Sequence, residues 1–147
     1  MSLTRANTEA ELVSRQKSRM EAVSMAVTVV GSNTDLNSPI GFAVRKMGGT
    51  VSSFSSVADA DLTFLDEEDF DQFLDIAEYR LMLNIKGRWG MVDMRIGPRS
   101  ENLSQFAEDL ERDIARKLSD LQSMYGFGGG SLEAGVVDYD FAETDEE

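Results

Sequence analysis

The chain has 147 residues, a length that fits one domain with an arm at either end. It contains neither cysteine nor histidine, which excludes disulfides, thiolate or imidazole metal sites and the Ser-His-Asp triad. The net charge is −13, and a body this acidic repels phosphate backbones, so DNA binding that reads sequence is not expected.

The N-terminal segment, residues 1–34, is predicted to be a helical arm. Thr8 and Glu11 have capping-box spacing, so a helix is expected from there to about Ala26. Its apolar positions are sparse, so the helix either faces solvent or buries a face only against another chain. Three cations recur at a two-residue step and would spread around a solvated surface, with contact to nucleic acid or to an acidic neighbour as the alternative: Arg15, Lys17 and Arg19.

A second, short helix is predicted after a turn-rich stretch. The β-branched run 27–30 is either a frayed helix end or a short strand. Ser38 then precedes a proline, the usual pairing of a capping residue with the first helical position. Gly48 and Gly49 end this helix; residues 50–58 are expected to be a loop, and residues 60–65 lead into the next element. Its apolar residues repeat at helical spacing: Ile40, Ala43, Val44 and Met47.

A longer amphipathic helix is predicted from an N-cap at Asp66 to Lys86 and Gly87. Its apolar stripe consists of Phe70, Phe73, Leu74, Ala77, Leu81 and Ile85. Carboxylates crowd its start, where they favour the positive end of a helix: Asp66, Glu67, Glu68, Asp69 and Asp71. They lack the spacing of an EF-hand loop, so capping is preferred to a Mg²⁺ or Ca²⁺ site and no metal ligand is assigned.

A turn-rich connection, residues 87–99, is expected to contain a brief strand, because Val92, Met94 and Ile96 alternate with charged residues. Trp89, the only tryptophan, either anchors a protein interface or fills the core between the two long helices. Ser100 is expected to cap the longest helix, which ends before Gly126. Its predicted buried stripe is Leu103, Phe106, Ala107, Leu110, Ile114, Leu118, Leu121 and Tyr125.

The last segment, residues 127–147, is predicted to be a flexible arm with seven Asp/Glu and no Lys/Arg. Its glycine run 128–130 is taken as a hinge, because no Lys-Ser/Thr follows as in a phosphate-binding loop. Large apolar residues then alternate with aspartates, a pattern that either adds as a strand to a partner's sheet edge or stays disordered. The residues predicted to bind a partner are Val136, Val137, Tyr139 and Phe141.

The predicted fold is mainly α: a small bundle of about four helices with an extended N-terminal helix and a C-terminal arm. Residues 35–126 would form the helical core between the two arms. No run of about 18 apolar residues predicts a membrane span, and the first residues lack the apolar stretch of a signal peptide. No residue is assigned to catalysis or to a cofactor, so the sequence predicts a protein that is not an enzyme.

Four segments resemble head-tail connector (adaptor or neck) proteins of tailed bacteriophages: residues 35–45 (DLNSPIGFAVR), residues 77–80 (AEYR), Val92-Asp93 and Gly97-Pro98-Arg99. The similarity covers about residues 35–126. It implies a dodecameric ring in the virion neck, made in the host cytoplasm. The ring would sit beneath the portal protein, carry a stopper or tail protein, and extend a channel through which DNA passes without sequence-specific binding. In related adaptors a C-terminal arm engages the portal.

Two alternatives remain open on the residues alone. The first is an acidic DNA mimic, or inhibitory binding protein, which would be a discrete monomer or dimer that blocks a nucleic-acid-binding partner. The second is an enzyme that uses the acidic cluster with a divalent metal. The resemblance does not explain the basic residues of the N-terminal helix.

Overall fold

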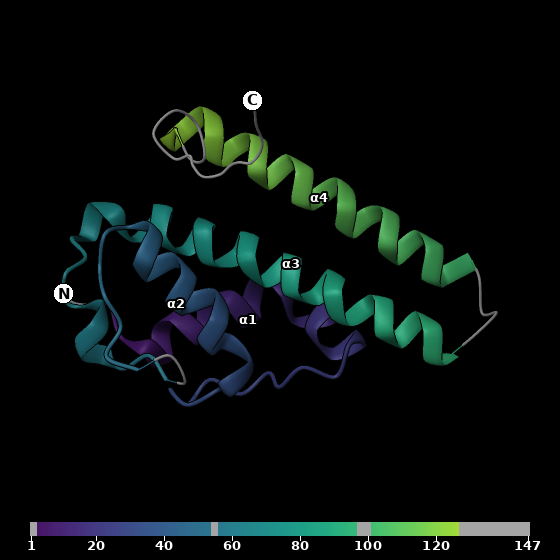
Figure 1. The fold of residues 1–147 in the computed structure, drawn as a ribbon, viewed down its shortest axis with the longest axis horizontal. Helices are drawn as coiled ribbons and strands as arrows, with labels where there is room; N and C mark the ends of the chain where they lie inside the picture. The colour runs from purple at the N-terminus through teal and green to yellow at the C-terminus, as the bar shows by residue number, and fades with distance from the viewer. Residues whose placement is uncertain (1–2, 54–55, 97–100, 127–147) are drawn as a thin grey trace, which may run out of the picture. The chain divides into compact units, whose positions relative to one another are not determined.

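The computed structural model describes residues 3–53, 56–96 and 101–126 (Figure 1). For residues 90–96 and 101–104 it describes the backbone alone. These residues form four α-helices and three short 3-10 turns, and no strand beyond an isolated bridge between Ser53 and Ser56. The mainly α prediction is therefore confirmed. The chain divides into two compact units, residues 1–114 and 115–147. In the first unit, α1 and α2 pack against α3.

Helix α1 spans Arg5–Ala22, so it begins and ends about four residues earlier than predicted. The N-cap is Thr4, whose hydroxyl oxygen accepts a hydrogen bond from the backbone N–H of Asn7 at 3.1 Å. Thr8 lies inside the helix and is buried; its hydroxyl donates to the Thr4 carbonyl at 2.8 Å. The predicted cap at Thr8 is therefore wrong, because Thr8 and Glu11 both lie within the helix. Thr4 has the extended backbone that an N-cap needs.

Both alternatives for this first helix are wrong, because α1 buries a face within its own chain. Its core-facing residues lie against the chain's other elements and are almost without exposed surface: Leu12, Val13 and Met20. The helix bends at Gln16, whose φ of −129° and ψ of 19° are not helical. Sparse apolar residues suffice here because polar residues on the same face are also buried and paired, as described below.

Helix α2 spans Asn37–Lys46 and follows a 3-10 turn, Thr34–Leu36. The side chain of Asn33 caps that turn by accepting from the backbone N–H of Asp35 at 3.0 Å. Helix α2 itself follows Leu36 without a side-chain cap, so the predicted cap at Ser38 is wrong and Ser38 lies in the first turn of the helix. Gly48, with φ of +92°, ends the helix as predicted. Three of the four predicted apolar residues are fully buried: Ile40, Ala43 and Val44. The run 27–30 forms neither helix nor strand.

Helix α3 spans Phe70–Ile96, after 3-10 turns at Asp59–Leu62 and Glu67–Asp69. The predicted end at Gly87 and the predicted strand at 92–96 are both wrong, because the helix runs through them. One glycine costs about 1 kcal/mol against alanine, which the burial of Ile85 and Trp89 on either side outweighs. The predicted stripe is confirmed at its centre by fully buried residues: Phe73, Ala77, Leu81 and Ile85.

Helix α4 spans Glu101–Tyr125 and ends at Gly126, whose φ of +68° confirms the predicted stop. Leu110 and Leu121 are fully buried, and the rest of the described stripe is half-buried. Ser100 lies outside the described residues. Within the part of the chain that the structure describes, no helix is both long and apolar enough to cross a membrane.

Candidate interaction surfaces

A buried ion pair joins the start of α1 to two distant loops. The Arg5 Nε lies 2.8 Å from a Glu9 carboxylate oxygen, and the two residues are 2% and 0% exposed. The guanidinium also donates to the carbonyls of Asn33 at 2.7 Å and Val57 at 2.9 Å. Glu9 accepts from the backbone N–H groups of Gly31 at 2.7 Å and Asn33 at 2.9 Å. Because these bonds satisfy both charges internally, the pair is structural.

A second polar group joins α1 to α3. Arg15 Nη1 lies 3.2 Å from the Asp75 carboxylate and 3.1 Å from that of Glu78, which also accepts from Gln16 at 2.7 Å. Burial lowers the pKa of Arg15, but the charges and hydrogen bonds of Glu78 and Asp75 outweigh it, so that pKa lies above its ordinary value. The solvated face expected for the cations of this helix is therefore wrong for Arg15.

Arg19 also leaves solvent, because it forms an ion pair with Asp113 of α4. Only Lys17 of the three predicted surface cations stays exposed. The sequence shows no signal for these pairs, since Arg15 and Glu78 are 63 residues apart and Arg19 and Asp113 are 94 apart. With two of the three cations engaged in the fold, little basic surface on α1 is left to bind nucleic acid.

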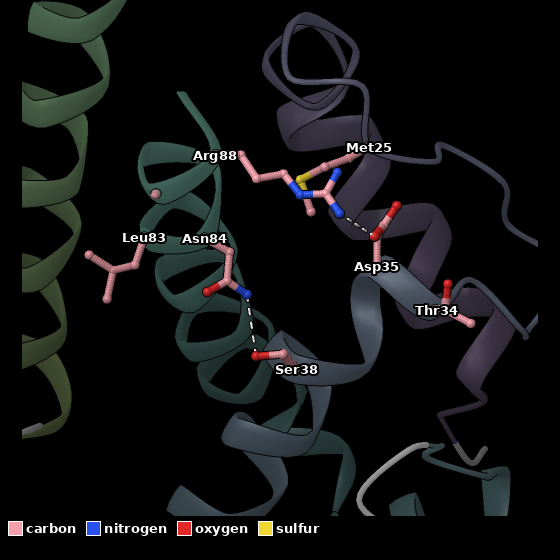
Figure 2. Close-up of a pocket in the computed structure, with 8 residues that line it drawn as sticks. Met25, Thr34, Asp35, Ser38, Leu83, Asn84 and Arg88 are labelled. Carbon is pink, nitrogen blue, oxygen red and sulfur yellow. Dashed lines mark hydrogen bonds and ion pairs between the residues drawn. The ribbon is translucent and has the colours of Figure 1, made fainter. Parts of the chain in front are cut away.

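A pocket of about 430 Å³ opens between α3 and the segment that leads into α2 (Figure 2). Arg88 of α3 reaches across it to the carboxylate of Asp35 at 2.9 Å, and Asn84 donates to the Ser38 hydroxyl at 3.3 Å. Met25 and Leu83 supply apolar lining. The one carboxylate is neutralised by the one guanidinium, so these residues offer a small polar binding surface and no nucleophile–base pair.

The residues assigned from sequence fall in two different situations. Trp89 is 9% exposed, and its ring centroid lies 4.2 Å from that of Phe106 at a 31° tilt, which fits the core alternative. The predicted partner-binding residues lie outside the described part of the chain: Val136, Val137, Tyr139 and Phe141. Around Asp66 and elsewhere in the described residues, no group of three or more candidate ligands is arranged to hold a metal ion.

Sequence reasoning missed two cations beside the Phe42 ring, Lys46 and Arg80. Together with the exposed Arg45, which precedes Lys46 on α2, they are here named the cationic patch: Phe42, Arg45, Lys46 and Arg80. Lys46 Nζ lies 5.5 Å and the Arg80 guanidinium carbon 5.1 Å from the centroid of the Phe42 ring. The i, i+3, i+4 spacing of Phe42, Arg45 and Lys46 on α2 is the signal that could have revealed it. Arg80 comes from α3, so only the packing of the two helices completes the patch.

Tyr79, which precedes Arg80 in α3, is expected to make the stability of the protein fall at alkaline pH. Burial raises the pKa of Tyr79, and the charge of Arg80 opposes part of that rise. A raised pKa means that the stabilising contribution is present below the unfolded pKa of about 10 and is lost as pH rises through the higher folded value. We expect Tyr79→Phe to flatten the fall in urea midpoint between pH 9 and 11, because phenylalanine has no proton to lose. Tyr125→Phe is the control, and equal slopes for Tyr79→Phe and wild type would contradict the assignment.

The geometry therefore comprises a buried network, a pocket crossed by its own ion pair and an open cationic patch. The first two use their charges inside the chain, which leaves the patch as a surface with positive charge to offer. Comparison with known proteins finds no matching family model, no similar characterised protein and no similar solved structure.

Proposed function

We propose that the protein is a structural virion protein, a connector subunit that forms a ring between the portal of the capsid and the tail. The observation that carries this proposal is the pair of long helices. At 1.5 Å per residue, the 27 residues of α3 and the 25 of α4 are each about 40 Å long. Helices of this length provide lateral surface on which copies of a subunit pack around a ring. The resemblance of residues 35–126 to connector proteins supports the same function.

The charge of the protein suits a channel for DNA. A net charge of −13 repels phosphate groups, so DNA would slide past the ring without adhering to it. In this proposal the ring extends the channel of the portal protein above and receives a stopper or tail protein below. The protein acts in the virion neck after synthesis in the host cytoplasm, and it performs no catalysis.

The C-terminal arm is proposed to dock on an adjoining component of the assembly, and its removal tests this. Deleting residues 131–147 should leave the urea midpoint unchanged, because a segment with seven carboxylates that follows a glycine run is not expected to contribute to the helical core. It should weaken capture of the protein by the immobilised portal protein of the same phage. An arm of equal length made of Gly and Ser is the control for chain length. Capture that is unaffected by the deletion would show that the arm does not dock on the portal protein.

An acidic DNA mimic is the second candidate, and the charge of −13 favours it. A mimic would remain a monomer or dimer and would inhibit a nucleic-acid-binding protein. Mass photometry separates the two proposals, because assemblies of many copies do not fit mimicry. Calorimetric titration with Mg²⁺ and Ca²⁺ tests the remaining enzyme alternative, for which the acidic residues from Asp66 to Asp71 would have to bind metal.

A further inference from the structure

The cationic patch differs from the other basic groups in how its charges are matched. At least six of the twelve cations whose side chains the structure describes lie within 4 Å of a carboxylate: Arg5, Arg15, Arg19, Lys86, Arg88 and Arg112. Among the described residues, no carboxylate lies within that distance of Arg45, Lys46 or Arg80. In a chain with 27 acidic and 14 basic residues, three unmatched cations on one surface are a notable concentration.

The chemistry of the patch suits an acidic peptide that also carries an aromatic residue. Lys46 and Arg80 both lie near the Phe42 ring, so a ligand meets positive charge beside an apolar face. The Arg80 Nε is buried and has no hydrogen-bond partner within the described chain. Carboxylates from outside would supply the missing counter-charge, and charge-assisted hydrogen bonds to arginine are stronger than neutral ones.

We propose that the acidic arm of a neighbouring copy, residues 131–147, docks on the cationic patch. The arm carries seven Asp/Glu, no Lys/Arg, and the aromatic residues Tyr139 and Phe141. Twenty-one residues follow Gly126, and an extended chain of that length reaches about 70 Å, which exceeds the roughly 35 Å diameter of a body of this size. An adjacent copy is therefore within reach.

This contact identifies the component of the proposed ring on which the arm docks. It rests on the proposed ring, because only in such an assembly is a neighbouring copy held close. Because the patch lies on two helices, side chains and not strand addition make the contact. Each copy would then give its arm to one neighbour and receive the arm of the other neighbour on its patch. Such a head-to-tail contact propagates from copy to copy and closes if the rotation allows.

Charge reversal in the full-length chain tests the contact by sedimentation velocity. We expect Lys46→Glu/Arg80→Glu to weaken self-association at least tenfold. Arg45→Glu/Lys46→Glu, which changes two exposed residues, should do the same if the first variant fails to fold. Lys17→Glu/Lys86→Glu makes the same change in net charge elsewhere and should change association less than threefold. Mixing Lys46→Glu/Arg80→Glu with an Asp138→Lys/Asp140→Lys chain should restore association, because each reversed patch then meets an arm in which the two carboxylates beside Tyr139 have been replaced by cations.

Cysteine cross-linking tests which segments meet, because the native chain has no cysteine. Chains with Met47→Cys, beside the patch, should form disulfide dimers with chains carrying Ala142→Cys in excess of either homodimer. The Lys46→Glu/Arg80→Glu changes and high salt should suppress these mixed dimers. Absence of mixed dimers, or their persistence in the reversed variant, would overturn the proposal.

The two proposals fail in different ways. If patch variants associate as wild type does while deletion of residues 131–147 still abolishes portal capture, the arm docks on the portal and the inference is wrong, but the connector function stands. If the arm and patch hold copies together and the assembly does not bind the portal protein, the inference stands and the connector function is wrong.

Discussion

Replacing Glu9 with alanine should lower the free energy of unfolding by about 3–5 kcal/mol, one of the two largest effects we expect. The change would leave the Arg5 guanidinium, 2% exposed, without its counter-charge in the protein interior. It would also remove the acceptor for the backbone N–H groups of half-buried Gly31 and buried Asn33, which would then lack this partner. Urea denaturation followed by circular dichroism measures the loss.

Two variants serve as controls for that result. Glu11→Ala removes a carboxylate from an exposed pair with Arg15 at 3.3 Å, and we expect a loss of at most about 1 kcal/mol. Arg5→Met/Glu9→Leu replaces both charges with apolar groups and should cost less than Glu9→Ala, because no unpaired charge remains, although the backbone N–H groups of Gly31 and Asn33 still lose their acceptor. A Glu9→Ala variant as stable as Glu11→Ala would mean that the pair is not buried in solution.

Trp89→Ala should also cost about 3–5 kcal/mol, since it removes a large buried side chain and leaves a cavity against Phe106. Urea denaturation at low protein concentration isolates this effect from association. Trp89→Phe, which keeps an aromatic ring, should lose considerably less. In a double-mutant cycle, Trp89→Ala and Phe106→Ala should be coupled by about 0.5–1.5 kcal/mol.

The same variant decides between the two roles that the sequence leaves open for Trp89. A core residue lowers stability when it is truncated, whatever the concentration. An interface anchor instead weakens association and leaves the stability of the isolated chain nearly unchanged. The second pattern would contradict the packing of Trp89 on Phe106 as the main role of this side chain.

The helices could be located from sequence because their signals are local. The stripe from Phe73 to Ile85 recurs at steps of three and four residues, and the structure buries it as expected. Gly48 and Gly126 ended their helices as predicted, since each adopts a positive φ. Gly87 did not, because a glycine only lowers helix propensity, and packing on either side of it outweighed that cost.

The candidate surfaces depended on contacts between segments far apart in the chain. The sequence alone showed a protein without cysteine or histidine, helical by its apolar periodicity, with a C-terminal segment whose charged residues are all acidic, because these properties need no knowledge of which residues meet. Tertiary packing decided that Arg15 and Arg19 leave solvent and that Arg80 joins Phe42 and Lys46. A charge acquires its role from its partner, and partners up to 94 residues away have no periodic signature in the sequence.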